Sequence, residues 1–398
     1  MKPIQIKNDV YWIGTLDAQR TVFDVIMPID HGTTYNAYLV RGTNKIAVLE
    51  TSKNLPDMQG QFLSRLQTLV DPVRIDYVIL NHLEPDHSGA LAALLELAPQ
   101  ARVVVSRNGE HFVRHLLNRD VQPLKVGDGD SLDLGSKTLR FVSAPFLHWP
   151  DTMFTYLAED RILFPSDFLG SHYCDERLFS DLVGDFSHYF RYYYDVIMRP
   201  YKEYVLKALD KIKDWPLDLI CPSHGPVLRG NLSFYTESYA AWSRLPAPSA
   251  QKRALVLYAS AYGNTARMAT AVTEGLTASG VASETLDIGA STPPDLLDKL
   301  EAADALVIGS PTFVGDALKP VWGLMASLAT IKVKGKVAAA FGSYGWSGEA
   351  VAMLQERFRS LKMKVVEPGV RAILVPTAED LEQCRELGRR VAVALAAS

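Results

Sequence analysis

The strongest constraint on the fold is a short segment in which an apolar run leads directly into a cluster of metal-binding side chains. The run Tyr77–Leu80 is followed by His82, Glu84, Asp86 and His87, four potential ligands within six residues. Side chains this close along the chain converge on one point only if the backbone turns sharply, as a strand-to-helix loop containing a proline does. The segment therefore predicts a strand that ends at a metal site.

Three further candidate ligands lie far along the chain, each shortly after another strand-like run. They are His148 in a His-Trp-Pro-Asp sequence, Asp167, and His224 in a Cys-Pro-Ser-His sequence. Loops at one edge of a sheet gather together, so we expect these side chains to join the first four. The chain has only nine histidines, and four of them fall in these segments.

Seven nitrogen and oxygen ligands are enough for two metal ions that share a bridging carboxylate. Such a set suits iron, manganese or zinc, whereas copper(I) and iron–sulfur clusters prefer sulfur ligands. The alternative interpretation is a polar cluster held together by hydrogen bonds without any metal.

The second half of the chain has a different pattern, which begins after a proline-containing stretch. Residues 245–253 hold two prolines and small residues, and proline disfavours helix at and just before its position, so we expect a linker there. Beyond it, five apolar runs alternate with helical patterns, which is typical of a doubly wound parallel sheet. The expected strands are 254–260, 283–288, 305–310, 337–342 and a region around 365–374, and the expected helices are 265–279, 318–328, 349–361 and 378–396.

The pattern before the linker is more mixed, with strand-like runs separated by helices. Gly127-Asp-Gly129 has the composition of a hairpin turn. The expected strands are 45–49, 77–80, 102–105, 138–142, 153–157 and 162–164, and the expected helices include 56–69 and 89–98.

Three loops of the second half combine glycine with hydroxyl-bearing residues, and each follows an expected strand. The first leads into a helix, where hydroxyls and free backbone N–H groups can bind a phosphate. It matches neither Walker A nor GxGxxG, and alone it is equally consistent with a helix cap. In a doubly wound sheet the three loops surround the ligand crevice, where aromatic residues can flank a planar ring. The candidate binding residues are Ser260, Tyr262, Gly263, Asn264, Thr265, Pro311, Thr312, Phe313, Ser343, Tyr344, Gly345, Trp346 and Gly348.

The composition excludes several classes of protein. A chain of 398 residues with 48% hydrophobic and 22% charged residues predicts two ordered domains. A net charge of −4 without a basic block argues against a nucleic-acid partner, and no apolar run is long enough for a membrane span. The charged N-terminus is unlike a secretory signal, and three scattered cysteines do not make a disulfide framework. We expect a reduced, cytoplasmic protein.

The ligand pattern resembles that of the metallo-β-lactamase fold. Hydrolases of that fold normally carry histidine at the position of Glu84, whereas glutamate there and the His-Trp-Pro-Asp run match the flavodiiron proteins, or A-type flavoproteins. The three loops of the second half resemble flavodoxin, whose cofactor is FMN. The resemblance implies an α+β unit over residues 1–248, a metallo-β-lactamase-like αββα sandwich, and an α/β unit over residues 254–398, a flavodoxin-like doubly wound parallel sheet.

The same resemblance implies two iron ions and assigns their ligands. In some members the position of His87 is uncoordinated. The carboxylate of Glu84 would favour a harder iron centre that can reach the ferric state. The implied ligands are His82, Glu84 and His148 for one iron and Asp86, His87 and His224 for the other, with Asp167 as the bridge.

Members of the family reduce dioxygen to water with four electrons, nitric oxide to nitrous oxide with two, or both. FMN would pass electrons from an external donor, either a rubredoxin-type protein or a reduced deazaflavin coenzyme. A homodimer or a homotetramer is implied. His172, close to Asp167 in the sequence, and Tyr194, in a run of three tyrosines, are the candidates for catalytic roles beside the irons.

Two alternatives belong to other classes of function. One is a binuclear zinc hydrolase fused to a flavodoxin-type electron-transfer domain, because zinc accepts most of these ligands. Glu84 argues against it, and metal analysis separates the two. The other is an electron carrier or gas sensor that binds FMN and metal without turnover.

Overall fold

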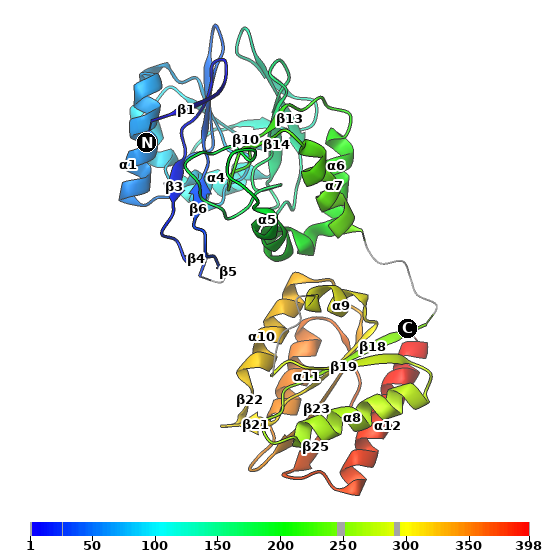
Figure 1. Ribbon diagram of the computed structural model, residues 1–398. Helices are drawn as coiled ribbons and strands as arrows, with labels where there is room; N and C mark the ends of the chain where they lie inside the picture. Colours follow the sequence, from blue (N-terminus) through cyan, green and yellow to red (C-terminus); the bar gives the residue numbers. More distant parts are fainter. Residues whose placement is uncertain (1, 26, 245–250, 290–294, 398) are drawn as a thin grey trace. The chain divides into compact units, whose positions relative to one another are not determined.

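The computed structural model describes residues 2–25, 27–244, 251–289 and 295–397. The chain divides into two compact units, Met1–Arg244 and Leu245–Ser398, which are described separately (Figure 1). Most of the expected linker, residues 245–250, lies outside the described residues. None of the helices in the described ranges combines the length and apolar character that a membrane crossing requires.

The N-terminal unit is built on two sheets. The first is β1 (Ile4–Lys7), β2 (Val10–Trp12), β7 (Tyr38–Arg41), β8 (Ile46–Leu49), β9 (Tyr77–Ile79), β10 (Arg102–Ser106) and β11 (Leu124–Val126), in that order. The second is β12 (Ser131–Asp133), β13 (Thr138–Ser143), β14 (Met153–Leu157), β15 (Ile162–Phe164), β16 (Leu219–Ile220) and β17 (Leu228–Arg229). Two small ribbons pair β3 (Thr15–Asp17) with β6 (Thr33–Tyr35) and β4 (Val22–Phe23) with β5 (Met27–Pro28).

Helices cover the outer faces of both sheets, which makes four layers. Buried Trp12 of the first sheet and Phe141 and Phe164 of the second belong to one core between the sheets. Outside the first sheet pack α1 (Pro56–Leu69), α3 (Leu91–Leu97) and α4 (Gly109–Leu117). Outside the second pack α5 (Ser187–Tyr193), α6 (Lys202–Ile212) and α7 (Leu232–Ser243). The short turns are η1 (Pro72–Arg74), η2 (Tyr194–Met198) and η3 (Arg199–Tyr201). The predicted αββα sandwich is confirmed.

The packing of strands β8, β9 and β10 explains why the run Tyr77–Leu80, which precedes the first candidate ligands, is almost entirely apolar. They pair in parallel, and every residue of β8 and β9 is buried, because helices cover one face and the second sheet covers the other. The hydrophobic run therefore stops where the chain leaves the sheet, which is where the ligands begin.

The Gly127–Gly129 turn differs from the expectation of a hairpin. The chain does turn there, since Asp130 N–H donates to the Gly127 carbonyl at 3.1 Å. However, β11 before the turn belongs to the first sheet and β12 after it belongs to the second. The turn carries the chain between the layers, so the hairpin prediction is wrong.

The C-terminal unit is a parallel sheet in the order β19 (Ala282–Asp287), β18 (Arg253–Tyr258), β20 (Ala305–Gly309), β23 (Val337–Tyr344) and β25 (Val370–Ile373). This order, 2-1-3-4-5 along the chain, is that of flavodoxin-like sheets. Strand β24 (Lys364–Val365) pairs with the start of β23, and the ribbon of β21 (Thr312–Phe313) and β22 (Asp316–Ala317) adjoins its end.

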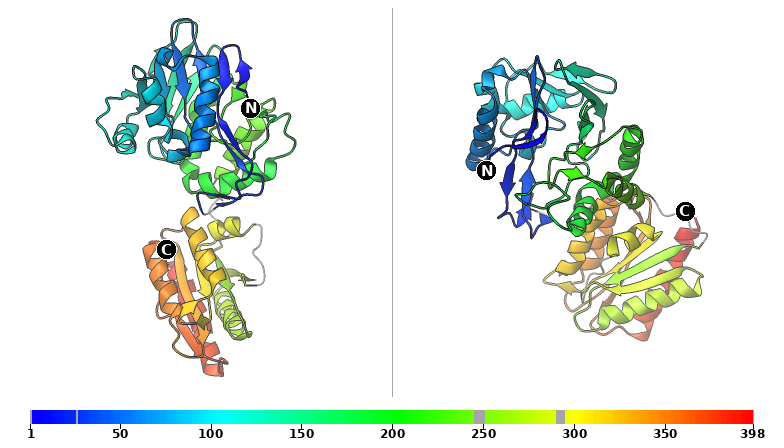
Figure 2. Two further views of the ribbon diagram at one scale, coloured as in Figure 1. Left: turned by 90° about the vertical axis from the view of Figure 1, so that its left-hand side faces the viewer. Right: turned by 45° about the horizontal axis from the view of Figure 1, so that its top comes forward.

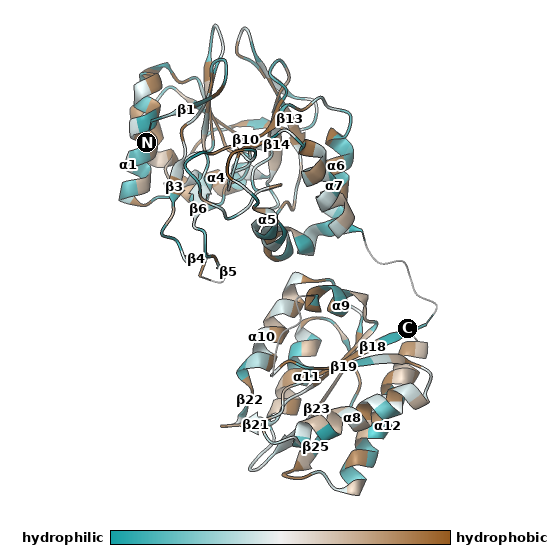
Figure 3. Cartoon of the chain, in the orientation of Figure 1, coloured by the Kyte–Doolittle hydropathy of each residue, from teal (hydrophilic) through white to brown (hydrophobic). Residues whose placement is uncertain are grey.

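Helices pack on both faces of this sheet. Helices α8 (Asn264–Ala278) and α12 (Ala378–Ala396) lie side by side on one face (Figures 1 and 2). The other face is covered by α9 (Leu296–Ala302), α10 (Lys319–Ser327), α11 (Ala350–Ser360) and the turn η4 (Leu328–Thr330). Along these helices hydrophilic and hydrophobic residues alternate, as expected where one side faces a core (Figure 3).

Candidate metal centre and flavin pocket

The seven predicted ligands come from both sheets of the N-terminal unit and meet in one place. The loop after β9 carries His82 and Glu84, and the short helix α2 (Pro85–Ser88) carries Asp86 and His87. The other three follow strands of the second sheet: His148 lies between β13 and β14, Asp167 after β15, and His224 after β16.

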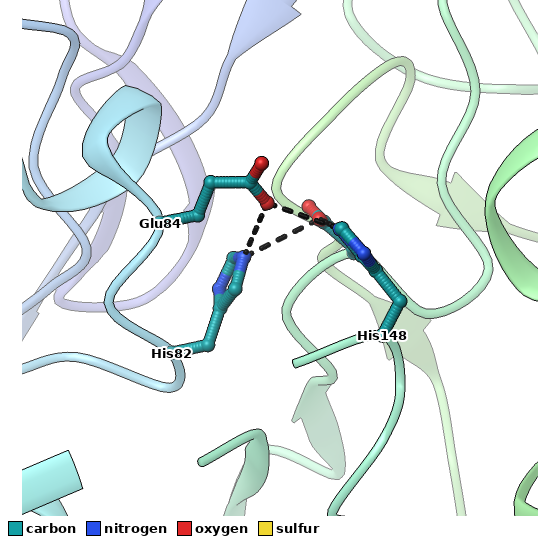
Figure 4. A group of neighbouring side chains, drawn as sticks. His82, Glu84 and His148 are labelled. Atoms are coloured by element: carbon teal, nitrogen blue, oxygen red, sulfur yellow. Dashed lines mark hydrogen bonds and ion pairs between the residues drawn. The ribbon is translucent and has the colours of Figure 1, made fainter. Parts of the chain in front are cut away.

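The first group of side chains surrounds Glu84. His148 Nε2 lies 3.0 Å and His82 Nε2 lies 3.3 Å from Glu84 Oε2, so both imidazoles point at the same carboxylate oxygen (Figure 4). Asp167 Oδ2 completes the group, at 3.4 Å from His82 Nε2 and 3.3 Å from His148 Nε2. The four residues each offer a ligand atom within 4.8 Å of the others.

The second group lies on the other side of Asp167. His87 Nε2 and His224 Nε2 lie 3.3 and 3.2 Å from Asp86 Oδ2. Asp167 Oδ1 is 3.1 Å from His87 Nε2 and 3.7 Å from His224 Nε2. Asp167 thus turns one oxygen toward each group, the arrangement of a bridging carboxylate. His87 is fully buried and directed into the centre.

The spacing and burial of these atoms fit metal ions. Ligand atoms that each lie about 2.1 Å from one ion are separated by about 3.0–3.4 Å from their neighbours. Both oxygens of Asp86, both ring nitrogens of His87 and Asp167 Oδ1 are buried without a hydrogen-bond partner in the described structure. Unpaired buried polar atoms are costly, and cations satisfy them.

The electrostatics of the centre show how strongly the carboxylates and imidazoles interact. Burial acts to raise the pKa of Asp167, but the His82 and His87 charges outweigh it and hold this pKa well below its usual range. Burial acts to lower the pKa of His148, but the Asp167 and Glu84 carboxylates raise it to about 9. The site favours positive charge inside a ring of carboxylates, which is the requirement for holding cations.

Backbone and hydroxyl groups orient the ligand rings. His224 Nδ1–H donates to the Thr34 carbonyl at 2.6 Å, which leaves Nε2 free to face Asp86. His82 Nδ1 lies 2.6 Å from Ser166 Oγ. Asp151 accepts from the Leu83 N–H at 2.9 Å and so braces the loop that carries His82 and Glu84. Such outer partners set the tautomer and direction of metal ligands.

Sequence reasoning missed most of these supporting residues. Thr34 and Ser166 contribute through single backbone or hydroxyl atoms, and no spacing pattern marks such contacts. Asp151 could have been recognised as a supporting residue, because it is the last residue of the His-Trp-Pro-Asp run that begins with His148. Gly225, beside His224, has φ +78°, and an added Cβ would overlap oxygen atoms of Ser171. A glycine directly after a candidate ligand was a further available signal.

His172 lies beside the second group of ligands. Its ring is 4.9 Å from that of His224 and 4.0 Å from that of Phe23, measured between centroids. Nδ1 lies 2.8 Å from Thr33 Oγ1, and Nε2 is buried without a hydrogen-bond partner among the described residues. Burial, together with the nearby His224, holds the pKa of His172 well below its usual value, so the ring is neutral.

The structure places Tyr194 away from the centre and its neighbour Tyr193 beside it. The Tyr194 hydroxyl forms a 2.8 Å hydrogen bond with Ser243 Oγ, and its ring packs on Tyr239 and Trp242. The Tyr193 ring lies 4.9 Å from the ring of His172 and is fully buried. The prediction of Tyr194 beside the ligands is therefore wrong, because the side chain of the run that lies next to them is that of Tyr193.

The C-terminal unit has a pocket of about 390 Å³ formed by the three predicted loops and by the end of β25. It lies where the strand order reverses between β18 and β20, the usual ligand position in this type of sheet. Its lining residues are Ser260, Ala261, Tyr262, Asn264, Pro311, Thr312, Phe313, Val314, Gly315, Ser343, Tyr344, Gly345, Trp346, Ser347 and Leu374.

Ten of the predicted binding residues line this pocket and three do not. Gly263 is the left-handed residue that directly precedes α8, and Thr265 is buried with its hydroxyl 3.0 Å from Ser343 Oγ. Gly348, with φ +78°, packs against the Tyr344 ring. These three shape the loops rather than the wall. Five lining residues were not among the predicted ones. Ala261, Val314, Gly315 and Ser347 belong to the three predicted loops, and Leu374 follows β25, where the rule that loops follow parallel strands also applies.

The pocket fits a ligand with a phosphate and a flat ring. Ser260 and Asn264 lie where the loop enters α8, and Ser260 Oγ accepts from the Ala266 N–H at 3.3 Å. The aromatic residues Tyr262 and Trp346 line the pocket and are 82% and 86% exposed. A helix N-terminus with free N–H groups suits a phosphate, and aromatic rings suit a planar heterocycle.

Comparison with known proteins agrees with both halves of this description. The profile of a family described as ODP family beta lactamase matches residues 33–225, and the flavodoxin profile matches residues 256–388. Together they define the class of protein: a flavoprotein in which a β-lactamase-like unit precedes a flavodoxin unit.

Relatives across the whole chain make the family specific. The type A flavoprotein fprA of Rhodobacter capsulatus is 45% identical, covering 98% of this chain and 91% of its own. The flavo-diiron protein FprA2 of Clostridium acetobutylicum is 39% identical, covering 98% of each chain. A nitric oxide reductase of Moorella thermoacetica is 35% identical, covering 99% of each. The chain belongs to the flavodiiron family, the type A flavoproteins.

A solved structure supports the same assignment. The rubredoxin oxygen:oxidoreductase of Desulfovibrio gigas superposes with a TM-score of 0.75 at 28% identity, covering 100% of this chain and 99% of that one. Membership of the family implies FMN and a pair of irons as cofactors, and the two ligand sites described above have donor sets that fit them.

Proposed function

We propose that this chain reduces dioxygen to water, nitric oxide to nitrous oxide, or both, at two irons that FMN supplies with electrons. The observation that supports this most directly is the position of Asp167, with one oxygen toward each group of imidazoles. The proposed ligands are His82, Glu84 and His148 for one iron, Asp86, His87 and His224 for the other, and Asp167 for both.

When bound, the irons and FMN would together store four electrons, the number that converts dioxygen into two waters, and two of them suffice to couple two nitric oxide molecules. The residues of the chain would hold the ions close together and exclude bulk water, because six of the seven ligands expose less than a fifth of their side chains and His148 exposes 20%. Glu84 adds negative charge, which stabilises a trivalent ion more than a divalent one.

His172 and Tyr193 are proposed to form hydrogen bonds beside the second iron. His172 Nε2 has no hydrogen-bond partner in the described part of the chain, and Tyr193 stays protonated because burial raises the pKa of its phenol well above the usual value. Both reactions consume protons, so uncharged groups that donate or accept hydrogen bonds next to the gas would help to orient the incoming water and protons.

The names of the relatives support both gases. One relative is a nitric oxide reductase, and a similar structure is a rubredoxin oxygen:oxidoreductase. We propose an external donor of the rubredoxin type or a reduced deazaflavin, a homodimer or homotetramer, and domain limits at 1–248 and 254–398. A cytoplasmic location stays a prediction.

The test begins with the metal and flavin content of the purified chain. Stoichiometric iron with FMN supports the proposal, whereas stoichiometric zinc would point to a hydrolase. Anaerobically reduced protein is then mixed with dioxygen or nitric oxide, and gas consumption is followed with electrodes. His224→Ala should lose iron and gas consumption but keep FMN, whereas His115→Ala, at an exposed position of α4, should change neither. Iron-loaded protein that consumes neither gas would contradict the proposal.

A further inference from the structure

One wall of the flavin pocket is a small hairpin with little support from the sheet. Strands β21 and β22 are two residues each and pair as Thr312↔Ala317 and Phe313↔Asp316. Strand β21 joins the main sheet at a single position, Thr312↔Tyr344. The tip residues Val314 and Gly315 line the pocket together with Phe313. The shape of this wall therefore depends on contacts outside the sheet.

The hairpin tip has an unfavourable backbone conformation for its sequence. Val314 and Gly315 have φ +53° and +75°, as a tight two-residue hairpin loop requires. Asparagine, aspartate or glycine normally occupy the first of these positions, and a β-branched residue is disfavoured there. Val314 is also 90% exposed, so packing does not compensate for its conformation. Some other interaction must hold the tip.

The side chain of Asp316 provides that interaction. Its Oδ1 accepts from Trp322 Nε1–H at 2.8 Å and from the Ala317 N–H at 2.7 Å. Trp322 lies on α10 and packs against the core beneath the helix. On the other side of the hairpin, Ser310 Oγ accepts from the Leu318 N–H at 3.0 Å. Thr312 Oγ1, at the base of the hairpin, also accepts from the Ala350 N–H of α11 at 3.3 Å. The hydrogen bond between Asp316 and Trp322 ties the strand after the tip to α10.

We propose that Asp316 and Trp322 are positioning residues that hold the β21–β22 hairpin in its flavin-binding shape before the flavin arrives. The inference rests on the proposed FMN site, and neither side chain lines the pocket itself. A wall that is already formed need not be ordered when the ligand binds, so more of the contact energy appears as affinity. Loss of the hydrogen bond between Asp316 and Trp322 should release the tip from its left-handed conformation and weaken binding.

The test measures FMN affinity of the full chain after its flavin has been removed, by quenching of flavin fluorescence. Trp322→Phe and Asp316→Ala remove the hydrogen bond, whereas Asp316→Asn keeps an oxygen acceptor at the same place. One hydrogen bond corresponds to about a 2- to 10-fold change in Kd. We expect this weakening for the first two variants and a smaller loss of affinity for Asp316→Asn, because its amide oxygen still accepts the hydrogen bond.

A second arm distinguishes positioning from general damage to the fold. Val314→Asn puts a residue that favours the left-handed conformation at the tip, so the hairpin should depend less on the hydrogen bond between Asp316 and Trp322. Trp322→Phe should therefore lower the FMN affinity less in the Val314→Asn background than in the parent. Equal Kd values for the parent, Trp322→Phe and Asp316→Ala would overturn the inference. An Asp316→Asn variant that binds FMN as weakly as Asp316→Ala would also overturn it. So would a Trp322→Phe substitution that lowers FMN affinity as much in the Val314→Asn background as in the parent. A parent chain that binds no FMN would instead overturn the proposed function.

Discussion

We expect His148 to make the stability of the metal-free protein fall as the pH rises, whereas the affinity of the site for metal should increase. Its Nε2 lies 3.0 Å from Glu84 Oε2 and 3.3 Å from Asp167 Oδ2. Although burial lowers the pKa of His148, these carboxylates raise it from 6.5 to about 9. A raised pKa means that the folded state binds the proton more tightly than the unfolded state, so His148 stabilises metal-free protein most at or below about pH 6.5.

The size of this effect follows from the shift. A difference of 2.5 pKa units, from 6.5 to about 9, corresponds to about 3 kcal/mol of stability that is lost between pH 6 and pH 9. Metal binding requires the neutral imidazole, so metal affinity should rise over the same range as protons stop competing. Removal of metal should therefore reverse the sign of the pH dependence.

Urea unfolding of metal-free protein at pH 6 and pH 9 measures the effect, with His148→Gln as the comparison. Glu50, whose pKa burial raises to about 8, destabilises the fold in the same direction, but it is present in both proteins and cancels in the difference. We expect the parent to lose about 3 kcal/mol more than His148→Gln over this range. Equal losses in the two proteins, or a parent that is more stable at pH 9, would refute the reasoning.

Three further predictions concern single side chains. Ser166→Ala removes the hydroxyl 2.6 Å from His82 Nδ1. It should weaken iron binding by about 10- to 100-fold, measured by competition with a chelator, and leave the FMN content unchanged. Unchanged iron affinity would show that the His82 ring does not need this partner. Gly225→Ala should lower the free energy of unfolding by more than about 2 kcal/mol, because its Cβ would overlap Ser171. The control Gly230→Ala, at φ +85° with open space around it, should lower this free energy by only about 1 kcal/mol. Similar losses in the two variants would contradict the overlap at Gly225. Trp346→Ala, at an 86% exposed position, should leave the melting temperature unchanged but weaken FMN binding by about 2- to 10-fold, and unchanged affinity would place the ring outside the flavin contacts.

The meeting of the seven candidate ligands in one place could be predicted because their signals are local. Four of them follow one buried strand within six residues, and the others each follow another strand-like run. Parallel or stacked strands bring such loops to a common edge, so the residue types and their order were enough to expect a shared site. The loops that line the flavin pocket follow the same rule, which also covers Leu374 after the last strand.

The choice between Tyr193 and Tyr194 could not be made in this way. Neighbouring residues of a helix point about 100° apart, so a run of three tyrosines gives no information about which one faces the centre. Helix α5 ends at Tyr193, and the wider turn η2 begins at Tyr194, which changes the direction of the following side chains. The packing of this helix on the second sheet decides the matter.

The amino-acid sequence by itself determined which chemical groups are available and which strands precede them. The end of a strand and the type of ligand that follows it can both be recognised from adjacent residues. Tertiary structure decided how those groups are oriented. The Thr34 carbonyl that orients the His224 ring and the Ser166 hydroxyl beside His82 Nδ1 act between segments far apart in the sequence, which no local pattern connects. Orientation depends on where separate segments meet, and that position exists only once the layers have packed.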